Sequence, residues 1–148
     1  MARFATSTYP VQAVPGYEFE STPDLSRRET RERLSQSALE GFFAILDKWG
    51  ISMEQAGVLL GERPRSSVYK LKTVPSTLRS DELLRISYLI GIYKALHILL
   101  PDDLADKWMT QPNDNPLFRG QPPLDYILRG IPAMQQVRSL LDAARGGR

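Results

Sequence analysis

The segment from Leu83 to Leu100 constrains the fold more than any other part of the chain, because apolar residues occupy nearly every side of the helix that it would form. We expect this helix to begin near Ser80, which would cap it, with Glu82 in the first turn, and to end before Pro101. A helix that is apolar all round must be buried on more than one face. The pattern therefore predicts either the central helix of an all-α fold or half of a dimer interface.

Glycine and proline residues divide the rest of the chain into shorter helical segments. Gly50 supplies a left-handed cap for an amphipathic helix, Ser52 is typical of an N-cap, and Pro64 suits a first helical turn. The segment between residues 110 and 122 is rich in proline and asparagine and predicts a surface loop, and residues 145–148 predict a loose cationic tail. The expected helices cover about residues 26–49, 52–60, 64–72, 80–100, 102–108, 122–130 and 132–144.

Several classes of chemistry are excluded by what the 148 residues lack. The chain has no cysteine, which excludes disulfides, zinc-thiolate sites, iron–sulfur clusters and thiol nucleophiles. No stretch approaches 18 uncharged apolar residues, and the first 20 residues lack the continuous apolar core of a signal peptide. We therefore expect a soluble, cytoplasmic protein that is not exported and does not interact with membranes.

The remaining polar residues do not have the pattern of an enzyme site. His97 is the one histidine, and a lone histidine on an apolar helix is typical of a hydrogen-bonded packing residue. The three aspartates within residues 102–106 favour interaction with a helix dipole over binding of a hard cation. Gly57 and Gly61 are not followed by the Gly-Lys-Ser/Thr of a phosphate loop. We expect no catalytic residue, no metal site, no cofactor and no small-molecule substrate.

A local excess of positive charge predicts a nucleic-acid interface. The net charge is only +2, yet residues 63–79 carry five cations and no acid. Two short helices with a glycine-containing turn make a helix-turn-helix, and Ala56 is small where the two helices must approach closely. The alternative is a helical hairpin whose basic face is merely solvated. The side chains expected to reach base edges or phosphates are Arg63, Arg65, Ser66, Ser67, Tyr69, Lys70 and Lys72.

Two stretches resemble known families. Residues 54–71 resemble the helix-turn-helix of Xre-type regulators, and the region from about Asp102 onward resembles the toxin-binding domain of Xre/ParS-type antitoxins. Together the resemblances cover about residues 35–145. They imply that the chain neutralises a RES-domain toxin that consumes NAD and represses its own operon by binding operator DNA. The features that carry the second resemblance are Trp108, Asn113, Pro116-Leu117-Phe118, Gly120, Pro122-Pro123-Leu124, Gly130 and a closing amphipathic helix.

The toxin-binding residues are expected in the loop and at the C-terminus. A loop that displays an aromatic side chain and an arginine offers the residue types that anchor interfaces, although Leu117 and Phe118 would equally plug the core of their own domain. A cationic tail next to Gly146 and Gly147 could reach an anion-binding site, such as one that holds a dinucleotide pyrophosphate. A frayed end that contacts nothing is the alternative. The expected toxin-binding residues are Trp108, Leu117, Phe118, Arg119, Arg145 and Arg148.

The expected organisation has three parts. Residues 1–25 form a flexible N-terminal arm, in which Tyr17 and Phe19 could form a short strand. Residues 26–100 form a helix-turn-helix and dimerisation domain, and residues 101–148 form a small helical toxin-binding domain. A homodimer is expected because one short recognition helix contacts few base pairs. Two other functions stay open: a stand-alone transcriptional regulator with a partner-sensing C-terminal region, and a structural adaptor with no role at DNA.

Overall fold

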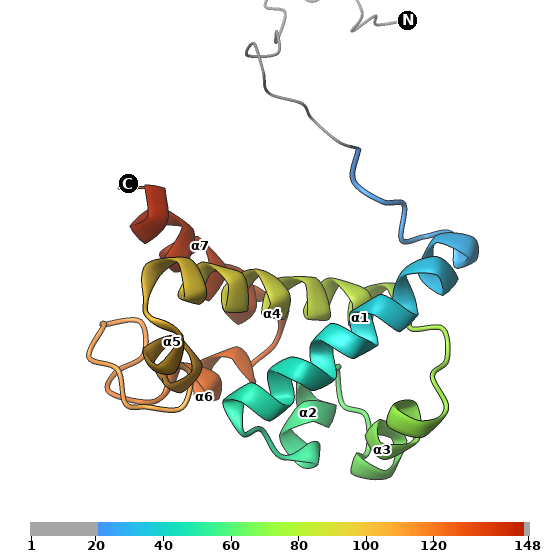
Figure 1. Ribbon diagram of the computed structural model, residues 1–148, viewed down its shortest axis with the longest axis horizontal. Coiled ribbons are helices and arrows are strands. Elements are labelled where there is room, and N and C mark those ends of the chain that lie inside the picture. The colour runs from blue at the N-terminus through green and yellow to red at the C-terminus, as the bar shows by residue number, and fades with distance from the viewer. Residues whose placement is uncertain (1–20, 147–148) are drawn as a thin grey trace, which may run out of the picture.

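The computed structural model describes residues 21–146, and within this range the chain is all-α, with seven helices and no strand (Figure 1). The all-α prediction is confirmed. The proposed strand at Tyr17 and Phe19, like Arg148, lies outside the described residues. The helices are α1 (Arg28–Trp49), α2 (Met53–Leu59), α3 (Arg65–Thr73), α4 (Ser80–Leu99), α5 (Asp102–Trp108), α6 (Pro123–Ile127) and α7 (Ile131–Gly146).

The predicted end signals produce the turns that join α1, α2 and α3. Gly50 follows α1 with φ 65°, the left-handed conformation that favours glycine, and its N–H bonds back to the last turn of the helix. The Ser52 hydroxyl accepts a 3.1 Å hydrogen bond from the N–H of Gln55, and the Gln55 side chain accepts a 3.2 Å hydrogen bond from the N–H of Ser52. Pro64 stands one residue before α3, as its N-cap. These caps fix where each short helix begins.

Helix α4 is the centre of the molecule. It packs against α1, α5 and α7, which surround it along its length (Figure 1). Leu89, Ile92 and Leu96 are fully buried. The prediction of burial on more than one face is confirmed, and helices of the same chain provide that burial. Residues from α1 to α7 thus form one continuous hydrophobic core.

Helix α7 differs from the prediction at its end. Met134, Val137 and Leu141 are buried as one stripe, as the spacing predicts. The helix continues to Gly146, so Arg145 is helical and the prediction of a loose tail from residue 145 is wrong at this position. The stripe against α4 stabilises the last turns. No helix among residues 21–146 has the length and apolar character needed to cross a membrane.

Candidate functional site

The turn between α2 and α3 depends on a very close approach at Gly57. The N–H of Arg63 donates a 3.0 Å hydrogen bond to the Gly57 carbonyl oxygen. A Cβ atom at Gly57 would lie 2.0 Å from the Arg63 carbonyl oxygen, well inside any permitted contact. Ala56, the residue singled out from the sequence, is fully buried beside it. The turn is therefore packed backbone against backbone, which fixes the start of α3.

Helix α3 presents a basic, hydrogen-bonding face to solvent. Val68 and Leu71 are buried, as predicted, and the opposite side of the helix is exposed. The Arg65 side chain is 62% exposed and lies 3.5 Å from the Glu54 carboxylate, and Tyr69 is 52% exposed. The other exposed members of the expected DNA-binding set are Ser66, Lys70 and Lys72.

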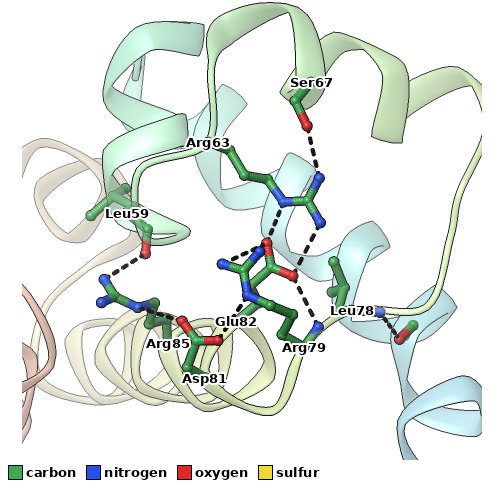
Figure 2. Close-up of polar contacts among 9 residues, drawn as sticks. Leu59, Arg63, Ser67, Leu78, Arg79, Asp81, Glu82 and Arg85 are labelled. Carbon is green, nitrogen blue, oxygen red and sulfur yellow. Dashed lines mark hydrogen bonds and ion pairs between the residues drawn. The ribbon is translucent and has the colours of Figure 1, made fainter. Parts of the chain in front are cut away.

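Arg63 and Ser67, also in the expected DNA-binding set, point into the protein. Figure 2 shows the Arg63 guanidinium between Ser67 of α3 and Glu82 of α4, where Nη1 donates a 2.8 Å hydrogen bond to the Ser67 hydroxyl. Nε and Nη2 both donate to the Glu82 carboxylate. The Arg63 side chain is 19% exposed and that of Glu82 is 0% exposed. The hydrogen bond to Glu82 raises the pKa of Arg63 above its usual value, so the guanidinium stays charged.

Glu82 also organises the start of α4. Its Oε1 accepts a 2.9 Å hydrogen bond from the N–H of Arg79, in the manner of a capping residue. Next to it, the N–H of Leu78 donates a 2.9 Å hydrogen bond to the Ser35 hydroxyl on α1 (Figure 2). The Arg85 guanidinium reaches the Leu59 carbonyl oxygen at the end of α2 at 3.4 Å. These contacts hold α2, α3 and the segment after α3 against α1 and α4.

An aromatic cluster fixes the loop after α5. Phe118 is 3% exposed, and its ring packs edge-to-face with Trp108 at 5.6 Å and with Tyr126 at 5.8 Å between ring centroids. The Asn115 side chain accepts a 2.9 Å hydrogen bond from the N–H of Leu117, which shapes the turn. The structure places Phe118 in the core and leaves Leu117 half-buried.

A groove of about 380 Å³ lies on the outer side of this cluster. Arg119 lines it from a left-handed conformation, φ 52°, that sends its side chain to the surface. The Arg129 guanidinium lies 4.8 Å from the centre of the Tyr126 ring, within the range of a cation–π contact. The groove combines apolar and cationic groups, which are the features of an interface anchor. The sequence prediction did not name Tyr126 and Arg129, which line this groove; their separation of three residues, across the end of α6, was the available signal.

Arg145 is exposed in the last turn of α7. Arg145 Nη1 lies 3.6 Å from the Asp142 carboxylate, a solvent-exposed pair of small energetic value. Its guanidinium is therefore available to a partner. Among residues 21–146, no cluster of three or more histidine, aspartate or glutamate side chains is arranged to hold a metal ion.

His97 joins α4 to α5. Its Nδ1 lies 2.8 Å from Asp102 and its Nε2 lies 2.8 Å from Asp106, while its ring packs on Tyr93 at 4.2 Å between centroids. Both ring nitrogens can donate to carboxylates only in the protonated imidazolium. The hydrogen bond to Asp102 raises the pKa of His97 above its usual 6.5, and Asp106 adds to the effect. The prediction of a hydrogen-bonded packing histidine is confirmed.

This contact predicts a stability that depends on pH. Because the pKa of His97 is raised in the folded state, its stabilising contribution is complete below the unfolded pKa of 6.5 and is lost as pH rises through the folded value. We expect the wild-type melting temperature to fall, relative to that of His97→Gln, as pH rises above 6.5. Thermal denaturation at a series of pH values measures this difference. If the difference in melting temperature between the wild type and His97→Gln does not change with pH, the charged contact of His97 with Asp102 and Asp106 does not stabilise the protein.

Comparison with known proteins agrees with this geometry. A family model described as the antitoxin Xre/MbcA/ParS C-terminal toxin-binding domain matches residues 95–147. The chain is 41% identical over 111 residues to the uncharacterized protein y4oB of Sinorhizobium fredii, in an alignment covering 74% of this chain and 84% of y4oB. It is 30% identical over 104 residues to the mycobacterial cidal antitoxin MbcA of Mycobacterium tuberculosis, which covers 69% of this chain and 86% of MbcA.

Proposed function

Because the chain belongs to the Xre/MbcA/ParS family of antitoxins of toxin–antitoxin systems, we propose that it neutralises a RES-domain toxin that consumes NAD and represses its own operon by binding DNA. The protein acts by binding its partners and not by catalysis. The match of the toxin-binding domain to residues 95–147 supports the toxin partner. The exposed basic face of α3 in a helix-turn-helix supports the DNA partner.

For DNA binding, α3 is the helix that enters the major groove. Its nine residues reach few base pairs, so a homodimer that reads two half-sites about 34–36 Å apart supplies the remaining affinity. Arg65, Tyr69 and Lys70 are the contacts that we propose for base edges and phosphates, with Ser66 and Lys72 beside them. Arg63 and Ser67 are turned away from this face, because the Arg63 guanidinium joins the Ser67 hydroxyl to Glu82.

Removing two of these cations is expected to weaken operator binding and its dependence on salt. Each phosphate contact contributes roughly 0.9 to the slope of log K against log salt concentration, so Arg65→Ala with Lys70→Ala should reduce the slope by about 1.8. Fluorescence anisotropy with DNA from upstream of the gene, at several salt concentrations, measures both quantities. Lys94→Ala with Lys107→Ala, two exposed cations outside α3, is the matched control. An unchanged affinity in the α3 variant would favour the structural adaptor.

For toxin binding, we propose the groove beside the aromatic cluster, with Leu117, Arg119 and Arg129 as contacts. Trp108 and Phe118 support this surface from behind. Arg145 and Arg148 add positive charge at the C-terminus, where they would reach an anion-binding site of the toxin, such as one for a dinucleotide pyrophosphate. The arginines of the groove and those of the C-terminus define two contacts that can be tested separately.

Co-expression with the product of the neighbouring gene tests the toxin partnership. Growth and cellular NAD are measured with the wild-type chain, with Arg119→Glu and Arg129→Glu together, and with Arg145→Ala and Arg148→Ala together. Deleting residues 102–148 would not be a clean test, because it removes α7 from the core around α4. Neutralisation by the wild type and its loss in the groove variant supports the proposal, and full protection by the C-terminal variant would refute insertion of the tail. If no chain affects growth, the stand-alone regulator becomes the better explanation.

A further inference from the structure

We propose that Arg63 and Glu82 are positioning residues for DNA binding: their buried ion pair sets the orientation of α3 on α4, and neither side chain touches DNA. The inference rests on the proposed DNA-binding function. It concerns the part of the basic segment that the structure turns away from solvent. The pair lies behind α3, between the turn that precedes this helix and the first turn of α4 (Figure 2).

Two contacts hold the N-terminal end of α3: the close backbone approach between Gly57 and Arg63, and the side chain of Arg63. The C-terminal end of α3 runs into residues 74–76, which are exposed, before Leu78 returns to the core. On its N-terminal side, Glu62 adopts φ 69°, an uncommon conformation for a residue with a side chain, and this turn directs the next residue inward. The Arg63 side chain then spans from this turn to α4. The pair therefore anchors the end of α3 that enters the groove first.

The hydrogen bonds form one directional chain from α4 to α3. Nε and Nη2 of Arg63 both donate to the Glu82 carboxylate, a two-point contact that fixes the plane of the guanidinium. Nη1 donates at 2.8 Å to the hydroxyl of Ser67 in the first turn of α3. Glu82 has no exposed side-chain surface, and its carboxylate also lies 3.6 Å from the Arg79 guanidinium, so a shift of α3 would take from this buried charge the closer of its two arginine partners. The angle of the helix is thus coupled to an ion pair that DNA does not reach.

Charge effects and positioning effects predict opposite signs for Glu82. Removing a carboxylate from a DNA-binding protein reduces repulsion of the phosphates, so a purely electrostatic role predicts tighter binding by Glu82→Gln. A positioning role predicts weaker DNA binding, because the amide that replaces the carboxylate has one oxygen atom, and not two, to accept hydrogen bonds from the Arg63 guanidinium. For Arg63, a phosphate contact predicts a salt slope smaller by about 0.9 in Arg63→Gln, whereas a positioning role predicts lower affinity with an unchanged slope.

The experiment measures the dissociation constant for operator DNA as a function of salt, with full-length variants. We expect Glu82→Gln and Arg63→Gln each to weaken binding by about tenfold, the size of a typical coupling, with the wild-type slope. The double variant should bind operator DNA at least as tightly as the weaker-binding single variant, because neither member of the Arg63–Glu82 pair is then left without the other. Glu54→Gln, which removes an exposed carboxylate near α3, should tighten binding. Toxin neutralisation should be unchanged in all of them.

Arg63→Lys keeps the proposal testable if the other variants fold poorly. Lysine retains the charge and lacks the planar fork, so a positioning role predicts weaker DNA binding at the same slope and a charge-only role predicts no change. Tighter binding by Glu82→Gln, a slope reduced by about 0.9 in Arg63→Gln, or wild-type affinity in Arg63→Lys would each overturn the inference. Lys70→Ala distinguishes failure of the proposed DNA-binding function from failure of the role of the ion pair. If Lys70→Ala leaves DNA binding unaffected, as do the variants of Arg63 and Glu82, the proposed DNA-binding function itself is wrong. If only the variants of Arg63 and Glu82 leave it unaffected, the role of the pair alone is wrong.

Discussion

Replacing Gly57 by alanine is expected to lower the free energy of unfolding by about 1–3 kcal/mol, the usual cost of overpacking a close contact. The added Cβ would lie 2.0 Å from the carbonyl oxygen of Arg63, a backbone atom that moves only if the whole turn moves. The same displacement would disturb the hydrogen bond from the N–H of Arg63 to the Gly57 carbonyl. The melting temperature should fall by about 2–4 °C per kcal/mol, and operator affinity should fall with it.

Gly146→Ala is the matched control for this variant. Gly146 is also helical, but no atom outside its immediate neighbourhood lies within 4 Å of its added Cβ. The substitution should leave stability unchanged or raise it slightly, because alanine favours the helix. Thermal denaturation and DNA-binding titrations of the two variants are compared directly. Equal melting temperatures would mean that α2 and α3 do not depend on the close approach at Gly57.

Replacing Phe118 by alanine is expected to destabilise the protein by about 3–5 kcal/mol, the usual cost of deleting a buried aromatic side chain. The ring is buried and contacts Trp108 and Tyr126 edge-on, so its loss leaves a cavity between α5 and α6. Chemical denaturation measures the loss of stability. Because Trp108 is one of two tryptophans, fluorescence reports the disturbed cluster directly. Toxin binding should fall only as the folded fraction falls.

Arg119→Ala gives the complementary result. Arg119 is exposed next to Phe118, so its removal should change stability by less than about 0.5 kcal/mol. Toxin binding by the folded protein should nevertheless weaken, because the groove loses one of its two arginines. If Phe118→Ala remains fully stable and still loses toxin binding, Phe118 is a contact residue and the assignment to the core is wrong.

Local signals predicted most of the helix boundaries. Gly50, Ser52 and Pro64 each impose a backbone conformation or supply a cap within a few residues, so their effect can be read without the tertiary structure. The apolar run of α4 likewise requires burial wherever it lies. The sequence could not distinguish burial within one chain from burial in a dimer, because the same apolar surface satisfies either. That distinction needed the positions of α1 and α7.

The functional surfaces were less predictable because they depend on long-range pairing. Glu82 has the pattern of an ordinary first-turn acid, and its partner Arg63 lies 19 residues earlier, in a segment that looks uniformly basic. The contacts of His97 with Asp102 and Asp106 cross the helix break at Pro101. Phe118 suits an interface as well as a core until Trp108 and Tyr126 are seen around it. In each case the residue type indicates which contacts the side chain can make, and only the tertiary packing shows where the side chain points.

The central position of α4 limits how parts of this protein can be exchanged with those of its relatives. The match to the toxin-binding domain begins at residue 95, inside α4, so a chimera joined there would combine two halves of one helix from different cores. Such a graft would set foreign residues of α4, such as those at positions 88 and 91, against a native α7. The exposed residues 74–76 offer a better joint, because a graft cut there transfers α4 together with α5, α6 and α7. The unit to transfer for the proposed toxin binding is then the complete α4–α7 segment, and the recipient must supply an arginine at position 63 to pair with Glu82.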